Sequence, residues 1–284
     1  MLSLSKHEAR TDRDMADLKI GVIGAGGRMG GAILRQAQET PGVAVVAACE
    51  TAGHPAIGRD AGEVAGIGAN GVTIGAQAQA VFDACEAAIE FSTPEASVAH
   101  AKLAAAQKRI HVIGTTGLDA NAERALGEAA KSATIVHAPN MSLAVNLLFA
   151  LTRQVAKTLG PEFDIEILEM HHRHKVDAPS GTALGLGRAA AEGRGVKLPD
   201  VQQLARQGIT GARRRGDIGF AALRGGDVVG DHSVIFAADG ERLELTHKGS
   251  SRQIFARGAV HAAIWARGKP PGLYAMTDVL GLKA

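Results

Sequence analysis

The sequence predicts an α/β protein with two domains, one built on a parallel sheet and the other on a mixed sheet. In the first half, short apolar runs alternate with helix-forming stretches, whereas in the second half strands follow one another with turn signals between them. The composition agrees: 46% of residues are hydrophobic but only 3% are aromatic, and there are 36 glycines. A core of Ala, Val, Ile and Leu suits buried parallel strands. At 284 residues the chain can bury a large core.

The first predicted unit is strand, glycine turn, helix and strand. An apolar strand at 20–23 leads into GAGGRMG at 24–30, and helix formers at 32–38 precede a strand at 43–49. That strand ends at the acidic residue Glu50. Glycines let backbone amides approach a pyrophosphate, and an acid at this place accepts hydrogen bonds from a ribose. The unit predicts a dinucleotide site.

The glycine pattern departs from the strict form of this motif. The glycines fit GxxGxxG through Gly24, Gly27 and Gly30, because Met29 stands where GxGxxG requires its last glycine. A flexible glycine turn without a ligand is the alternative, and the flanking strand, helix and Glu50 argue against it. A phosphate-binding P-loop is excluded, because no GK[ST] follows.

Three further strands each end in a polar loop. The strands are predicted at 87–91, 110–113 and 134–137, and their loops at 92–95, 114–117 and 138–142. Thr93 caps a helix with Pro94 at its first position, running to about Gln107. Since the carboxyl ends of parallel strands share one edge, the loops GTTG and APNMS should converge on the cofactor. Ordinary turn chemistry is the alternative.

The most unusual stretch is EMHHRHKVDAPSGTA at 169–183, which follows a predicted strand at 163–168. It places five basic side chains in succession: His171, His172, Arg173, His174 and Lys175. Ser180 is a natural helix cap, so the amides of Gly181 and Thr182 would face the same space and bind a carboxylate. A solvated basic loop and a zinc site are the alternatives; zinc is disfavoured because Cys49 and Cys85 form no CxxC pair.

The rest of the chain completes two domains. Ser142 caps a long helix at 143–159, and strands are predicted at 219–223, 228–237 and 243–247, linked through Gly225-Gly226-Asp227 and the hairpin signal Asp239-Gly240. Residues 193–216 should be a solvated loop carrying Arg213-Arg214-Arg215, and a helix at 252–266 should return to the first domain. We therefore assign 1–17 to a disordered extension, 18–141 and 252–284 to a dinucleotide-binding domain, and 142–251 to a second domain.

Composition excludes several classes of function. A net charge of +2 without a basic stripe disfavours nucleic acid as a partner. The longest apolar run, at 143–151, is too short to cross a bilayer, and 1–17 lacks the apolar core of a secretory signal. Two lone cysteines suit a reducing compartment, so we expect a cytoplasmic protein without a membrane partner, starting at Met1 or Met15.

Taken together, these motifs resemble one family. EMHHRHKVDAPSGTA, GAGGRMG, GTTG, APNMS and THKGSSR at 246–252 are similar to the dihydrodipicolinate reductases, the 4-hydroxy-tetrahydrodipicolinate reductases of diaminopimelate and lysine synthesis, over residues 18–284. The resemblance implies a Rossmann-like nucleotide domain. It also makes 142–251 a substrate-binding and oligomerisation domain of α+β type, whose mixed sheet assembles a homotetramer. It also implies reduction of a small cyclic dicarboxylate by NADH or NADPH, with no metal.

The resemblance also assigns roles to residues. It makes His171 the general acid/base and Lys175 the proton donor, and it places the substrate on His172, Gly181 and Thr182. The implied cofactor contacts are Gly24, Ala25, Gly26, Gly27, Arg28, Met29, Glu50, Gly114, Thr115, Thr116, Ala138, Pro139, Asn140 and Met141. Many relatives have Arg after the ribose-binding acid, where this chain has Thr51; without that partner for a 2′-phosphate, NADH is favoured.

Two other functions fit parts of the pattern. Another two-domain dehydrogenase of an amino or keto acid needs only the nucleotide domain. A redox sensor that binds NAD(H) without chemistry needs no cluster of basic residues, and its ligand binding would survive replacement of His171 and Lys175.

Overall fold

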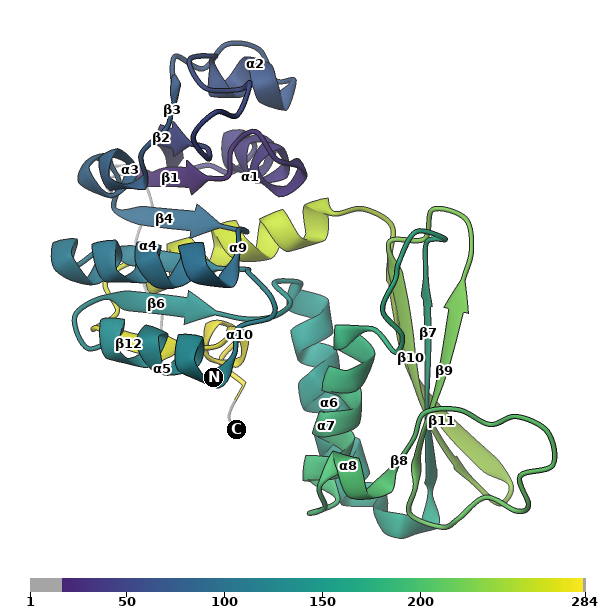
Figure 1. Ribbon diagram of the computed structural model, residues 1–284. Helices are drawn as coiled ribbons and strands as arrows, with labels where there is room; N and C mark the ends of the chain where they lie inside the picture. The colour runs from purple at the N-terminus through teal and green to yellow at the C-terminus, as the bar shows by residue number, and fades with distance from the viewer. Residues whose placement is uncertain (1–16, 283–284) are drawn as a thin grey trace, which may run out of the picture.

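The structure is a computed structural model that describes residues 17–282. The predicted disordered extension at 1–17 lies, except for Asp17, outside the described residues. The chain forms two lobes, each built on its own sheet (Figure 1). Among the described residues, no helix has both the length and the apolar character needed to cross a bilayer.

The first lobe is a seven-stranded parallel sheet in the order β12-β6-β5-β4-β1-β2-β3. Its strands are β1 (Leu18–Ile23), β2 (Val43–Cys49), β3 (Ile74–Gly75), β4 (Ala87–Glu90), β5 (Ile110–Ile113), β6 (Thr134–His137) and β12 (Gly272–Tyr274). The helices of this lobe are α1 (Arg28–Gln38), α2 (Ala61–Ala65), α3 (Ala78–Ala84), α4 (Pro94–Gln107), α5 (Ala120–Ala129), α9 (Gln253–Ala266) and α10 (Met276–Val279). The predicted Rossmann-like parallel sheet is confirmed.

Helices cover both faces of this sheet, which is why its strands are apolar runs rather than alternating ones. One core contains Ile20, Ile33 and Val112 and is closed by α1 and α9. The other contains Phe82 and Leu126 and lies under α3, α4 and α5. The carboxyl ends of β1, β4 and β6 point toward the second lobe (Figure 1).

The second lobe is a five-stranded mixed sheet in the order β11-β10-β7-β9-β8. Its strands are β7 (Asp164–His171), β8 (Gln202–Gln203), β9 (Ile218–Arg224), β10 (Gly230–Ala238) and β11 (Glu241–Gly249). Its helices are α6 (Leu143–Leu159), η1 (Gly160–Glu162), α7 (Gly181–Gly193) and α8 (Leu198–Val201). β7 runs parallel to β9 and antiparallel to β10. Alternate residues of β7 are buried against α6 and α7, so period two governs this sheet.

Both predicted links are confirmed: Gly225-Gly226-Asp227 joins β9 to β10, which β7 separates in the sheet, and Asp239-Gly240 is the hairpin turn between β10 and β11. The prediction for 193–216 needs correction. The loop at 193–216 is not wholly solvated: it contains α8 and β8, and Arg213 donates to Asp164 and Glu166. The carboxylates of these two β7 residues, which sequence spacing does not show, hold this arginine against the sheet.

The chain returns to the first lobe through α9, as predicted. α9 packs against α1 and against β4 and β5 of the sheet. Gly258 of this helix lies against the backbone at Met141, because a Cβ there would be 1.7 Å from the carbonyl oxygen of Met141. The two lobes are joined by a hydrogen bond in which Asn140 Nδ2 donates to Thr182 Oγ1 at 3.1 Å.

Candidate active site

The glycine turn lies at the carboxyl end of β1 and leads into α1. Gly24 has a φ of 77°, a conformation that favours glycine, and a Cβ on Gly30 would be 2.1 Å from the Gly24 carbonyl oxygen. The turn and the first turn of α1 can therefore lie this close together only because both positions are glycine. Gly27 supplies no side-chain cap to α1, in contrast to the Ser, Thr and Asp caps of α4 to α7. The first amides of α1 are therefore left without a protein cap and suit an anionic group.

Glu50 closes this turn. Its Oε2 accepts from the Gly26 amide and its Oε1 from the Thr51 amide, both at 2.9 Å. The carboxylate is thus fixed by two backbone donors at the end of β2, and each oxygen keeps a further acceptor site for a hydroxyl. Arg28 is exposed beside the turn. The residues present therefore fit a dinucleotide, with its pyrophosphate on the α1 amides and a ribose on Glu50.

The two later loops present mainly backbone to this edge. Thr115 is only 3% exposed, and its Oγ1 accepts from the Ser92 amide at 2.9 Å and from Ser97 Oγ at 2.8 Å. Ala138 and Met141 are also buried, whereas Thr116 and Pro139 are exposed. Any cofactor contact at the buried positions would come from their backbone atoms, which the sequence could not distinguish from side-chain contacts.

A buried polar cluster lies under these loops and was not predicted. Glu90, which is fully buried, accepts from Ser92 Oγ at 2.6 Å and pairs with His100 Nδ1 at 2.7 Å. His111 Nε2 lies 2.9 Å from Glu90 Oε1, although neither atom has a well-aligned hydrogen bond. Burial alone would raise the pKa of Glu90, but the charge of His111, together with the hydrogen bond and charge of His100, outweighs it and holds the pKa well below the ordinary value. Glu90 is therefore ionised and fixes Ser92, whose amide in turn binds the side chain of Thr115.

In the second lobe, His171 is the last residue of β7 and forms a dyad with Glu169. The two residues lie on the same face of the strand, and His171 Nδ1 is 2.6 Å from Glu169 Oε2. Burial would raise the pKa of Glu169, but hydrogen bonds from Arg224 and His171 lower it. An ionised carboxylate only accepts, so Nδ1 carries the proton and Nε2 keeps its lone pair. Burial lowers the pKa of His171, which is thus a neutral base at pH 7.

A second histidine backs this dyad. His232 of β10 faces His171 edge to face at 5.1 Å between ring centroids, and its Nε2 lies 3.0 Å from Ser180 Oγ. Burial lowers the pKa of His232 to about 4. Ser180 also donates its amide to Glu169 Oε1 at 3.1 Å and caps α7 through the Ala183 amide. The start of α7 is therefore bound to the same carboxylate that orients His171.

Lys175 and the α7 amides complete the group. Lys175 Nζ donates to Asp177 Oδ1 at 2.8 Å, so its immediate partner is acidic, although the neighbouring residues in the sequence are basic. Because Ser180 takes the Ala183 amide, the amides of Gly181 and Thr182 remain without a helix partner. Nδ1 of His172 is buried without a protein partner. These donors suit a carboxylate beside the base and the amine.

The structure thus gathers the predicted catalytic and substrate residues at one end of β7 and α7, and the predicted cofactor residues at the carboxyl edge of the first sheet. It also adds Glu169, Arg224 and His232, which the sequence reasoning missed. The period-two pattern of β7 could have found Glu169, since it lies two positions before His171 on one face. Arg224 and His232 come from other strands and carried no local signal. No group of three or more His, Cys, Asp or Glu side chains within residues 17–282 is arranged to hold a metal ion.

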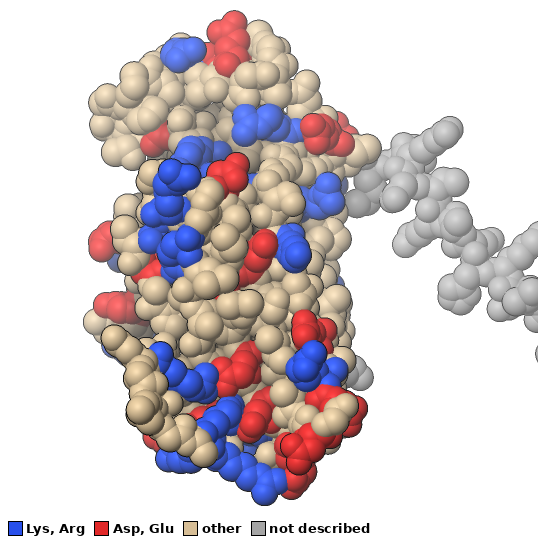
Figure 2. Space-filling model, turned by 90° about the vertical axis from the view of Figure 1, so that its right-hand side faces the viewer, with Lys and Arg blue, Asp and Glu red and all other residues tan. Residues whose placement is uncertain are grey.

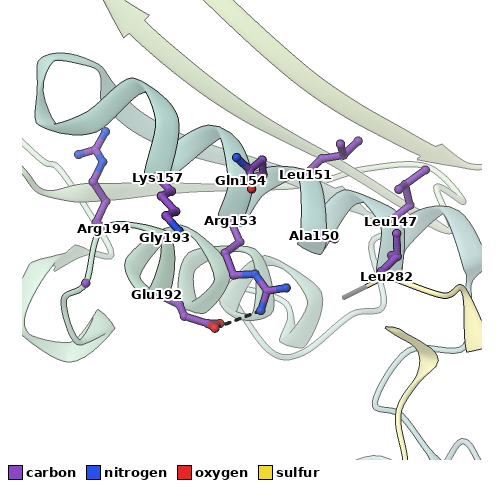
Figure 3. A pocket seen from close by; sticks show the side chains of 11 residues that line it. Leu147, Ala150, Leu151, Arg153, Gln154, Lys157, Glu192, Gly193, Arg194 and Leu282 are labelled. Atoms are coloured by element: carbon purple, nitrogen blue, oxygen red, sulfur yellow. Dashed lines mark hydrogen bonds and ion pairs between the residues drawn. The ribbon is translucent and has the colours of Figure 1, made fainter. Parts of the chain in front are cut away.

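A separate groove lies between α6, the end of α7 and Leu282 (Figure 3). It has a volume of about 760 Å³ and is lined by Leu147, Leu151 and Lys157, with Arg153 paired to Glu192 across it. None of the predicted site residues lines it.

A parallel sheet with an uncapped glycine turn, joined to a second lobe that carries a base, an amine and free helix amides, defines a two-lobed nicotinamide-dependent oxidoreductase. Family models described as "Dihydrodipicolinate reductase, N-terminus" and "Dihydrodipicolinate reductase, C-terminus" match residues 18–141 and 144–280. The chain belongs to the dihydrodipicolinate reductase family, as the sequence motifs indicated.

Relatives and solved structures agree with this assignment. The chain is 53% identical to the 4-hydroxy-tetrahydrodipicolinate reductase of Afipia carboxidovorans over 268 residues, which cover 94% of this chain and 98% of that protein. It is 56% identical to that of Brucella abortus over 262 residues, covering 92% and 98%. The fold is similar to that of the dipicolinate-bound dihydrodipicolinate reductase from Paenisporosarcina sp. TG-14, with a TM-score of 0.74, 21% identity, and coverage of 92% and 98%.

Proposed function

We propose that the chain reduces (2S,4S)-4-hydroxy-2,3,4,5-tetrahydrodipicolinate to tetrahydrodipicolinate with loss of water, using NADH or NADPH, in the diaminopimelate route to lysine. The observation that carries the proposal is the Glu169–His171 dyad beside Lys175 and the free amides of α7. In this proposal 18–141 with 252–284 form the nucleotide domain, and 142–251 form the substrate domain.

The protein's residues divide the work as follows. The glycine turn and Glu50 would hold the dinucleotide, whose reduced nicotinamide would supply a hydride to C4 of the substrate. His172, Gly181 and Thr182 hold the carboxylates and fix the ring. The Nε2 lone pair of His171 takes the proton from the carbon next to C4, because Glu169 holds the opposite nitrogen protonated, and returns that proton to the C4 hydroxyl, which leaves as water. Lys175 then gives a proton to C3, where negative charge develops.

A coupled assay tests this function. Aspartate semialdehyde and pyruvate are condensed by a synthase, and nicotinamide absorbance is followed on adding the protein. His171→Ala and Lys175→Ala should each lower turnover by roughly two powers of ten, the contribution of general acid or base catalysis, while cofactor binding barely changes. The exposed His261 and Lys157 serve as controls, and their alanine variants should retain full turnover. Equal activity in all four variants would refute the assignment.

The same variants separate the rival functions. If the protein is a sensor, nicotinamide absorbance does not change with this substrate although NADH binds. If it is a dehydrogenase of another amino or keto acid, NADH is consumed with that acid and not with the condensation product.

We also propose that the protein is a cytoplasmic homotetramer that assembles through the open face of the second sheet. This face is not covered by α6 or α7, and its centre is apolar: Leu168, Met170, Ala221, Leu223 and Ile235. Leu223 is 47% exposed in the single chain. Figure 2 views the molecule from this side and shows a band of uncharged side chains across the middle of the molecule. A second copy of this face would cover that band.

Sedimentation measures this assembly directly. The wild-type chain should sediment as a tetramer, and Leu223→Glu should sediment as a smaller species with the same circular dichroism. A wild-type monomer at micromolar concentration would contradict the proposal. Cys49 and Cys85, which are buried and unpaired, fit a reducing cytoplasm.

A further inference from the structure

Arg224, the last residue of β9, contacts both halves of the proton-transfer machinery. Its Nη1 donates to Glu169 Oε2 and its Nη2 to Glu169 Oε1, both at 2.9 Å, which is a bidentate pair. Nη2 also donates to the backbone oxygen of Asp177 at 2.6 Å. One guanidinium therefore joins the end of β7 to the loop that follows it.

Each of these contacts leads to one of the two residues proposed to move protons. Glu169 is the partner of His171 Nδ1 at 2.6 Å, and Asp177 is the partner of Lys175 Nζ at 2.8 Å. We propose that Arg224 is a positioning residue that sets the orientation of His171 and Lys175 together, through Glu169 and the Asp177 backbone. The proposal rests on the proposed function for its kinetic consequence, but not for its geometry.

The burial of Glu169 explains why an arginine is needed. Glu169 is 1% exposed, and without the charge of Arg224 this buried carboxylate would draw a further proton onto the imidazole of His171. An imidazolium at His171 has no lone pair on Nε2 and cannot act as the base. Arg224 prevents this, and its planar fork occupies both carboxylate oxygens, which a lysine could not do.

The charged and titratable groups around His171 predict the direction in which its pKa changes when Arg224 is removed. Glu169 faces it from its own strand, Arg224 from β9, His232 from β10, and Lys175 from the loop after β7. The positive charge of Arg224 contributes to lowering the pKa of His171. Removing that charge should raise the pKa of His171, so more of the enzyme carries an inactive imidazolium at pH 7.

The test compares Arg224→Ala and Arg224→Lys with Arg213→Ala. Arg213 is a matched control, because it pairs with Asp164 and Glu166 at the opposite end of β7 and contacts no proposed site residue. Arg224→Ala should lower kcat by about 100-fold, the typical cost of misplacing a reacting group, with KM for NADH unchanged. In the same variant, the fall of kcat/KM on the acid side of the pH profile should move to higher pH. Arg224→Lys keeps the charge but not the fork, so kcat should fall with little movement of that limb.

Two further measurements keep the test decisive. Added guanidinium should partly restore kcat of Arg224→Ala and leave Arg213→Ala unchanged. The pKa of His171, followed by imidazole NMR in the ligand-free protein with His171→Ala for assignment, should rise in Arg224→Ala. If the wild-type protein is inactive in the coupled assay, the proposed function fails. The NMR titration of His171 still tests the positioning role of Arg224, because it needs no substrate. An unchanged pKa of His171, or equal kinetic losses in Arg213→Ala, would overturn the proposal.

Discussion

Gly30 and Gly31 are neighbours in α1 that should respond in opposite ways to the same substitution. A Cβ on Gly30 would lie 2.1 Å from the Gly24 carbonyl oxygen and 2.6 Å from Ala25 Cα, well inside the 3.0 Å that real Cβ atoms keep. Both atoms belong to the backbone, so the turn itself must move. The nearest atom to a Cβ on Gly31 is the flexible guanidinium of Arg35 at 3.4 Å.

The magnitudes follow from two opposing contributions. Replacing Gly by Ala inside a helix gains about 1 kcal/mol, and forced overpacking costs about 1–3 kcal/mol. Gly31→Ala should therefore raise the free energy of unfolding by up to about 1 kcal/mol. Gly30→Ala should lower it by up to about 2 kcal/mol, and displacement of the turn amides should weaken NADH binding by about tenfold or more, since about 1.4 kcal/mol is a tenfold change.

Urea unfolding followed by circular dichroism measures the first quantity for both variants, and fluorescence titration with NADH measures the second. Gly31→Ala should bind NADH as wild type does. If Gly30→Ala is as stable as Gly31→Ala and binds NADH equally well, the close approach of α1 to the glycine turn does not exist, and the site built on it is wrong.

Three other outcomes follow from the structure. Thr51→Arg should raise kcat/KM for NADPH relative to NADH, whereas a wild-type enzyme that strongly prefers NADPH would contradict the inference from Thr51. Because the pKa of Glu90 is lowered in the folded state, its ionised form stabilises the fold above about pH 4.3, and this stabilisation is lost as the pH falls further. Glu90→Gln should thus lower the free energy of unfolding in urea by about 2 kcal/mol at pH 7 and by less at pH 3. Burial raises the pKa of Cys49 to about 12 and of Cys85 to about 11, so iodoacetamide at pH 8 should label neither thiol until the protein is unfolded.

Local patterns predicted those elements whose ends are set by local chemistry. The helices α4, α6 and α7 begin where Thr93, Ser142 and Ser180 were expected to cap them, since the cap hydrogen bond spans only three residues. Strands covered on both faces were found as apolar runs, and β5 and β6 were predicted to the residue. These features depend on sequence neighbours alone.

Features that depend on distant partners were missed. β12 was not predicted, because a three-residue strand is defined only by its pairing with β6. The buried pair of Glu90 and His111 comes from two different strands, and the Arg224 contact with Glu169 spans 55 positions in sequence. The motifs placed the proton-transfer residues in one stretch, but they did not show which carboxylate orients which base. That information is in the strand order, which brings β9 and β10 to either side of β7.

The connection between the lobes explains how two sites on separate sheets remain in register. Asn140 closes the loop after β6, where its oxygen Oδ1 accepts from the Ser142 amide, and its backbone oxygen accepts from Asn146 of α6. The same side chain donates to Thr182 at the start of α7, whose cap Ser180 is bound to Glu169. A chain of hydrogen bonds thus runs from the edge of the nucleotide sheet to the carboxylate that orients His171. Because these hydrogen bonds tie the loop at Asn140 to the start of α7, movement of that loop should be transmitted to the amides where the substrate carboxylate is proposed to bind.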